Sequence, residues 1–82
     1  MTVAQCTHRN HTIIAAIEEH PGIPTPWEGG CRITDPEGQT TRRLGLPLKA
    51  KFLPELDSAQ HASLAHGRWL VDQHLDHGMQ WH

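Results

Sequence analysis

Three prolines and three glycines fall within residues 21–30, and they constrain the fold more than any other part of the chain. Such a segment cannot continue a helix or a regular strand, because proline lacks an amide hydrogen and glycine loses the most backbone freedom on ordering. We therefore expect residues 21–30 to form an extended, turn-rich crossing anchored by Trp27. The regular elements must lie on either side of it.

Residues 11–20 have the pattern of a first helix. Ile13, Ile14 and Ile17 fall on one side of a helix with 3.6 residues per turn. Asn10 is a suitable N-cap residue. Pro21 ends the segment, because the residue before a proline is disfavoured in helical conformation.

The next part of the chain predicts strands. Asp35-Pro36-Glu37-Gly38 has the residues of a type I turn and lies between residues 31–34 and 39–44, which predicts a β-hairpin. Residues 48–52 alternate between apolar side chains and lysines, which predicts a third strand. Flanking prolines and outward lysines are typical of edge strands.

A long C-terminal helix is predicted from Asp57 to Gly78. Asp57 with Gln60 fits a capping box, and Gly78 fits the glycine that follows a helix. The apolar side chains form two stripes, one of Leu64, Val71 and Leu75 and the other of Ala62, Ala65 and Trp69. One stripe is expected to dock on the sheet, and the second either completes the core or meets another chain.

The order of elements is αβββα. This predicts an α+β fold, in which a three-stranded antiparallel sheet carries two helices packed on one face. A chain of 82 residues is expected to form a single domain, residues 1–82, with loosely ordered tails at 1–9 and 79–82. No apolar stretch resembles a signal peptide or a membrane span. We therefore expect no membrane contact and a cytoplasmic location, where Cys6 and Cys31 stay reduced.

Eight histidines include two His-x-x-His pairs, and histidine is the commonest metal ligand. The candidate metal ligands are Cys6, His8, His11, His74 and His77. A zinc ion held by ligands from both ends would join the termini. However, there is no Cys-x-x-Cys motif, and histidines in a last helical turn are stabilised without metal by the helix dipole. We therefore predict no cofactor, with structural zinc as the alternative.

Neither cysteine lies in a sequence context known for a nucleophile, so we do not predict an enzyme. Residues 32–51 carry a net charge of +3, although the whole chain has a net charge of −2. Tryptophan is frequent at the energetic centres of interfaces. The candidate partner-binding residues are Arg32, Arg42, Arg43, Lys49, Lys51 and Trp69.

Together these features predict a small non-enzymatic regulator or inhibitor that binds and occludes an acidic surface of a larger protein. Phage and other mobile-element proteins that block a host defence or transcription enzyme have this profile. One alternative is a zinc-stabilised module that binds nucleic acid, although a pI near 6.4 disfavours nucleic acid as the partner. The other is an antitoxin-like homodimer formed through the C-terminal helix.

Overall fold

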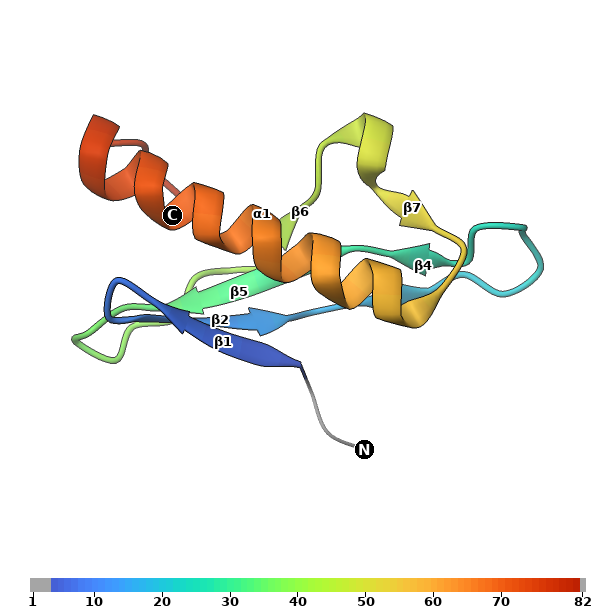
Figure 1. Ribbon diagram of the computed structural model, residues 1–82, viewed down its shortest axis with the longest axis horizontal. Helices are drawn as coiled ribbons and strands as arrows, with labels where there is room; N and C mark the ends of the chain where they lie inside the picture. Colours follow the sequence, from blue (N-terminus) through green and yellow to red (C-terminus); the bar gives the residue numbers. More distant parts are fainter. Residues whose placement is uncertain (1–3, 82) are drawn as a thin grey trace.

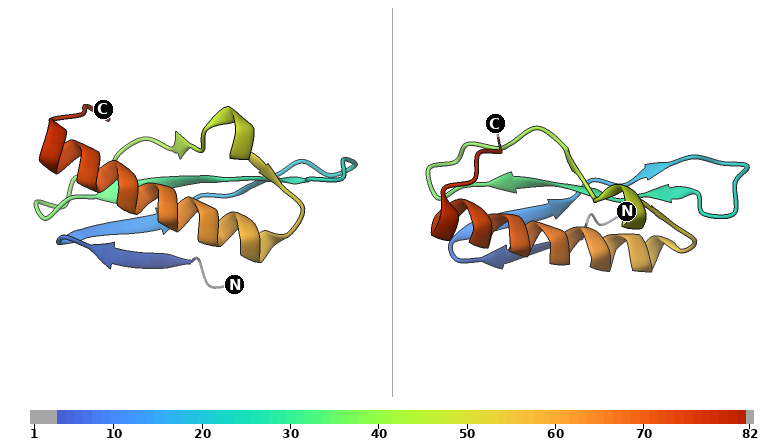
Figure 2. Two further views of the ribbon diagram at one scale, coloured as in Figure 1. Left: turned by 45° about the horizontal axis from the view of Figure 1, so that its top comes forward. Right: turned by 90° about the horizontal axis from the view of Figure 1, so that it is seen from above.

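Helix α1 (Leu56–His77) is the longest element, and the strands are organised around it. In the computed structural model, which describes residues 4–81, α1 lies across one face of a four-stranded antiparallel sheet (Figure 1). The strand order in this sheet is β1-β2-β5-β6, and α1 contacts the two central strands most extensively. The molecule therefore has two main layers, with the helix on one side and the sheet on the other (Figure 2).

β1 (Gln5–His8) and β2 (His11–Ala15) form a tight hairpin. Arg9 and Asn10 connect the two strands with φ values of 51° and 66°, as a two-residue type I′ turn requires. The helix predicted over 11–20 is therefore wrong. The β-branched run 12–14 favours a strand, and Asn10 serves a turn instead of an N-cap. The loose tail predicted at 1–9 is also wrong for residues 5–9, whereas residues 1–3 lie outside the described part.

A second, longer hairpin runs from β2 to β5 (Gly30–Thr34), and residues 21–26 form its far end. The short strands β3 (Glu18–Glu19) and β4 (Trp27–Glu28) continue it in the same register. β7 (Phe52–Leu53) pairs with β4 and completes a second antiparallel sheet of order β3-β4-β7. The segment 21–30 is therefore a hairpin end and part of two strands, rather than the crossing that was predicted.

The predicted turn at 35–38 is confirmed. The Gly38 amide donates to the Asp35 carbonyl at 3.0 Å. The Asp35 carboxylate accepts the amides of Glu37 and Gln39, both at 2.9 Å. Beyond the turn, the chain returns to pair with β5 at Thr34–Thr40 and then through β6 (Leu44–Gly45). The hairpin is present, but with fewer paired residues than the sequence predicted.

The third strand predicted over 48–52 is wrong. Leu48–Ala50 form a short 3₁₀ helix, η1, directly after Pro47, and only the end of the segment contributes to β7. The side chain of Leu48 is 85% exposed, so the alternation of apolar and charged residues did not mark a buried face.

The end of α1 is predicted correctly and its beginning is not. Gly78 has φ 68°, its amide donates to the His74 carbonyl at 3.1 Å, and the Met79 amide donates to the Gln73 carbonyl at 3.3 Å. These two bonds are the ones that close a helix in a Schellman motif. At the other end the N-cap is Glu55, and no side chain caps the helix, so the predicted capping box does not form.

The core joins both layers and the C-terminal tail. Its fully or largely buried members are Ile13, Cys31, Ile33, Leu70, Val71 and Trp81. Because Trp81 is 5% exposed, the loose tail predicted at 79–82 is wrong for this residue. The α+β class is confirmed, but the described residues form seven strands in two sheets and one α-helix, instead of three strands and two helices. Within residues 4–81 no helix is long and apolar enough to cross a membrane.

Candidate functional site

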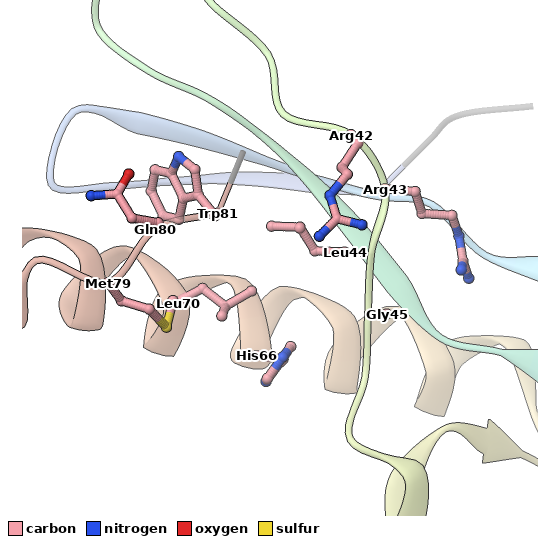
Figure 3. A pocket seen from close by; sticks show the side chains of 9 residues that line it. All are labelled: Arg42, Arg43, Leu44, Gly45, His66, Leu70, Met79, Gln80 and Trp81. Atoms are coloured by element: carbon pink, nitrogen blue, oxygen red, sulfur yellow. The ribbon is translucent and has the colours of Figure 1, made fainter.

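A pocket of about 280 Å³ lies between α1, the segment 42–45 and the C-terminal tail. It is lined by Arg42, Arg43, Leu44, Gly45, His66, Leu70, Met79, Gln80 and Trp81 (Figure 3). Three separate parts of the chain therefore build one concave surface, and we call it the groove. Its volume is slightly below the range of pockets that enclose drug-sized ligands.

The wall formed by the tail is held in place by aromatic contacts. The Trp81 ring stacks on His74, with centroids 4.0 Å apart and planes at 18°, and it meets the edge of His11 at 5.8 Å. His74 Nδ1 donates to the Met79 carbonyl at 2.6 Å. Two of the predicted metal ligands, His11 and His74, thus support the wall of the groove.

The opposite rim is formed by α1. The rings of His66 and Trp69 stack at 5.6 Å with planes at 15°. Burial lowers the pKa of His66, because desolvation disfavours the charged imidazole. Trp69 is 51% exposed. A half-exposed indole therefore stacks on an imidazole that lines the groove.

The two adjacent arginines differ completely in their surroundings. Arg43 donates to the carbonyls of Ala16, Glu28 and Gly29 at 2.8, 3.1 and 3.2 Å, and to the Glu28 carboxylate at 3.1 Å. The absence of a side chain at Gly30 leaves the space that the Arg43 guanidinium occupies, because a Cβ at residue 30 would lie 2.7 Å from the guanidinium carbon. Arg43 therefore joins parts of the fold and is not available to a partner as the sequence predicted.

Arg42 is exposed, and within residues 4–81 its guanidinium makes no hydrogen bond or ion pair. Figure 3 shows its side chain on the same side of the chain as Leu44, whereas Arg43 extends away from it. Arg42 therefore brings an uncompensated positive charge to the groove.

The other predicted partner-binding residues lie elsewhere. Arg32 alternates with the buried Cys31 and Ile33 on β5, so it lies on the sheet face opposite α1. Lys49 is exposed on η1, and Lys51 Nζ is 3.9 Å from the Glu28 carboxylate. The predicted basic surface is therefore divided. Of its members Arg42 and Arg43 line the groove, and Trp69 stacks on His66, which also lines it.

The predicted metal ligands do not gather into one site. His8 Nε2 is 2.9 Å from the Asp72 carboxylate, and the nearest partner of Cys6 Sγ is the Arg68 guanidinium at 3.8 Å. His77 is exposed in the last turn of α1. Zinc binding by Cys6, His8, His11, His74 and His77 would therefore require the chain to rearrange.

Among the described residues, one set of three potential metal-ligand atoms lies within 4.8 Å, from Glu18, His20 and Glu28. These carboxylates already have cationic partners, because Arg43 lies 3.1 Å from Glu28 and 3.8 Å from Glu18. Burial of Glu28 opposes its ionisation, but the hydrogen bond from His20 and the nearby Lys51 and Arg43 lower its pKa overall. A divalent cation would have to compete with these charges, so the set does not fit a metal well.

Cys6 and Cys31 are not joined by a disulfide in the structure. Burial raises the pKa of Cys31 to about 11, so its sulfur is a protonated part of the core at neutral pH.

In comparisons with known proteins, no family model, curated sequence or solved structure matches this chain. Its class is therefore defined by the fold and the groove: it is a small two-layer α+β domain with a concave surface lined by two arginines. The sequence pointed to Arg42 and Arg43 in the lining and to Trp69 beside it, but not to His66, Leu44, Leu70 or the tail. Trp81 carried a signal, since a tryptophan so close to the end of a chain either frays or docks.

Proposed function

We propose that this protein is a small non-catalytic binding module that occupies an acidic surface of a larger protein partner. One observation carries the proposal: the unpaired guanidinium of Arg42 lines the groove, and the half-exposed indole of Trp69 stacks on His66, which lines the same groove. Arginine and tryptophan are the side chains enriched at the energetic centres of interfaces, next to well-packed pockets. Regulation would then follow from steric occlusion of the partner.

The chemistry of the groove supports binding more than catalysis. Its imidazole, on His66, is partly desolvated and stacked on Trp69 rather than hydrogen bonded to a carboxylate. A general base usually has an orienting acid beside it, and the residues that line the groove include no Asp or Glu. The groove therefore offers contact area and charge.

Capture of the partner by variants tests the proposal. Immobilised wild-type protein is exposed to extract of its source cells, and the captured protein is identified and then titrated in purified form. We expect R42E and W69A each to weaken affinity by more than tenfold, which corresponds to at least about 1.4 kcal/mol at an interface centre.

The chain provides a matched control for each variant. R32E makes the same change at an exposed arginine on the opposite side of the sheet. L75A removes a 45% exposed side chain from another side of α1. If the controls weaken binding as much as R42E and W69A do, the groove is not the interface and the proposal fails.

A homodimer through α1 is a second candidate, and the exposure of Trp69 and Leu75 on this helix favours it. Dimer formation predicts a melting temperature that rises with protein concentration. Sedimentation of the wild-type protein and of W69A would separate this candidate from binding to another protein.

A further inference from the structure

The groove has a lining that is part apolar and part polar, with space for one side chain. Its large non-polar lining residues are Leu44, Leu70, Met79 and Trp81. Its volume of about 280 Å³ is small for a cofactor but adequate for a single large side chain. Methionine and leucine adapt to the shape of an aromatic ring, and a thioether beside an aromatic ring is favourable.

The charge at the groove is positive and local. The lining contains two arginines and no carboxylate. The charge of Arg43 is balanced by Glu28 and by Glu18, at 3.1 and 3.8 Å. The charge of Arg42 has no such partner in the part of the chain that is described. The groove therefore favours a carboxylate over a neutral or cationic group, and a guanidinium can hold a carboxylate through two parallel hydrogen bonds.

The two properties together define a ligand more narrowly than either alone. From them we infer that the groove recognises a segment of the partner in which an aromatic side chain stands next to a carboxylate, with the ring inserted between Leu44 and Leu70 and the carboxylate on Arg42. This inference rests on the proposed function and specifies the chemistry of the partner. The stack of His66 on Trp69 extends the apolar surface along α1 for the neighbouring residues of that segment.

A pair of small probes tests the inference without knowledge of the partner. Indole-3-acetate carries an aromatic ring and a carboxylate, and indole-3-acetamide has nearly the same shape without the charge. Each is titrated into the full 82-residue chain, and backbone amide shifts of Leu44, Gly45 and His66 are followed by NMR. Acetate alone measures the contribution of the anion.

We expect both indole probes to shift the groove resonances, with the acid binding about fivefold more tightly than the amide, the size of one exposed charge-assisted contact. Acetate should have little effect. R42Q should remove the preference for the acid, and R32Q should keep it. The inference would be overturned if the acid and the amide bound with equal affinity, or if acetate shifted the groove resonances as much as indole-3-acetate does. The absence of any shift at millimolar probe would overturn it as well.

The result separates this inference from the proposed function. If the probes fail while partner capture still depends on Arg42 and Trp69, the groove is an interface of different chemistry and only the inference is lost. If the probes bind as expected while R42E captures the partner normally, the proposed function is wrong and the groove takes a small acid. Self-association that R42E abolishes would make a second copy of the chain the occupant, which also overturns the inference.

Discussion

Replacement of Arg43 by methionine should destabilise the fold severely, although the residue follows directly after the exposed Arg42. Its guanidinium donates four hydrogen bonds, to three backbone carbonyls and to the Glu28 carboxylate. These acceptors lie on both strands of the long hairpin. Ala16 lies between β2 and β3, and Glu28 and Gly29 lie where β4 ends and β5 begins. Methionine fills a similar volume and satisfies none of them.

The loss in free energy of unfolding can be estimated from the burial of the Arg43–Glu28 ion pair. The loss of one partner of a buried ion pair costs about 3–5 kcal/mol. The side chains of Arg43 and Glu28 are 20% and 11% exposed, so water relieves part of this cost. His20 remains hydrogen bonded to Glu28 at 2.9 Å, which reduces it further. We therefore expect a loss of about 3 kcal/mol, the lower end of the range.

Urea unfolding followed by tryptophan fluorescence measures this loss. A loss of about 3 kcal/mol should lower the melting temperature of a domain of this size by roughly 12–24 °C. That is a large share of the roughly 4–12 kcal/mol expected for the total stability of such a chain.

R42M is the matched control and should change stability by less than about 0.5 kcal/mol. G30A should destabilise the protein by less than R43M, because its methyl group would meet the guanidinium of Arg43, the end of a flexible side chain that can shift. Equal stability of R42M and R43M would refute the assignment of Arg43 as an internal residue.

Three further predictions follow from the packing and the charges. G67A should destabilise the protein by roughly 1–2 kcal/mol in thermal unfolding, despite the better helix propensity of alanine, because its Cβ would collide with a methyl group of the fully buried Ile13. Hydrogen bonds from His8 and then Arg9 lower the pKa of Asp72 below its usual 3.8, so its contribution to stability is present above that pH and is lost as the pH falls through the lower, folded-state value. Urea titrations between pH 7 and pH 3 should therefore show a smaller loss in D72N than in the wild type. Mass spectrometry after iodoacetamide treatment at pH 8 should find Cys31 unmodified until the protein unfolds, because its thiol is buried and has a pKa of about 11.

The turns and the end of the long helix could be predicted from the sequence because single residues determine them. The Asp35 carboxylate and the positive φ of Gly38 fix the turn within four residues. Gly78 ends α1 in the same local way. Such features depend on backbone geometry that few residue types can adopt.

The first helix was predicted wrongly because the apolar pattern over residues 13–17 fits two periods. Ile13 and Ile17 are compatible with one face of a helix, whereas the buried residues follow a period of two along β2. Pairing with β1 and β5 on either side determines that this segment is a strand and not a helix. The two-residue Arg9-Asn10 turn was the local signal that could have indicated a hairpin.

The first half of the face of α1 that packs on the sheet could not be found by a search for apolar residues, although Leu70 and Val71 mark its second half. Ala59, Ser63 and Gly67 are all buried there, and two of them are too small or too polar to suggest a core. Ser63 is buried because its hydroxyl accepts the Gly30 amide at 3.0 Å and donates to the Ala59 carbonyl at 2.6 Å. Small residues let the helix approach the sheet closely, which leaves larger side chains such as Trp69 on the outside.

This close approach also explains why the groove exists and why its charge could not be predicted. Because α1 lies so near β2 and β5, the chain leading into β6 passes beside the helix, and the tail closes the third side through Trp81. Arg42 and Arg43 are neighbours of the same type, and only the path of the chain decides which one binds Glu28 and which one remains unpaired. An exposed positive charge left unpaired at the groove costs the fold little and is free to interact with a ligand. For this reason we assign ligand binding to Arg42 and a structural role to Arg43.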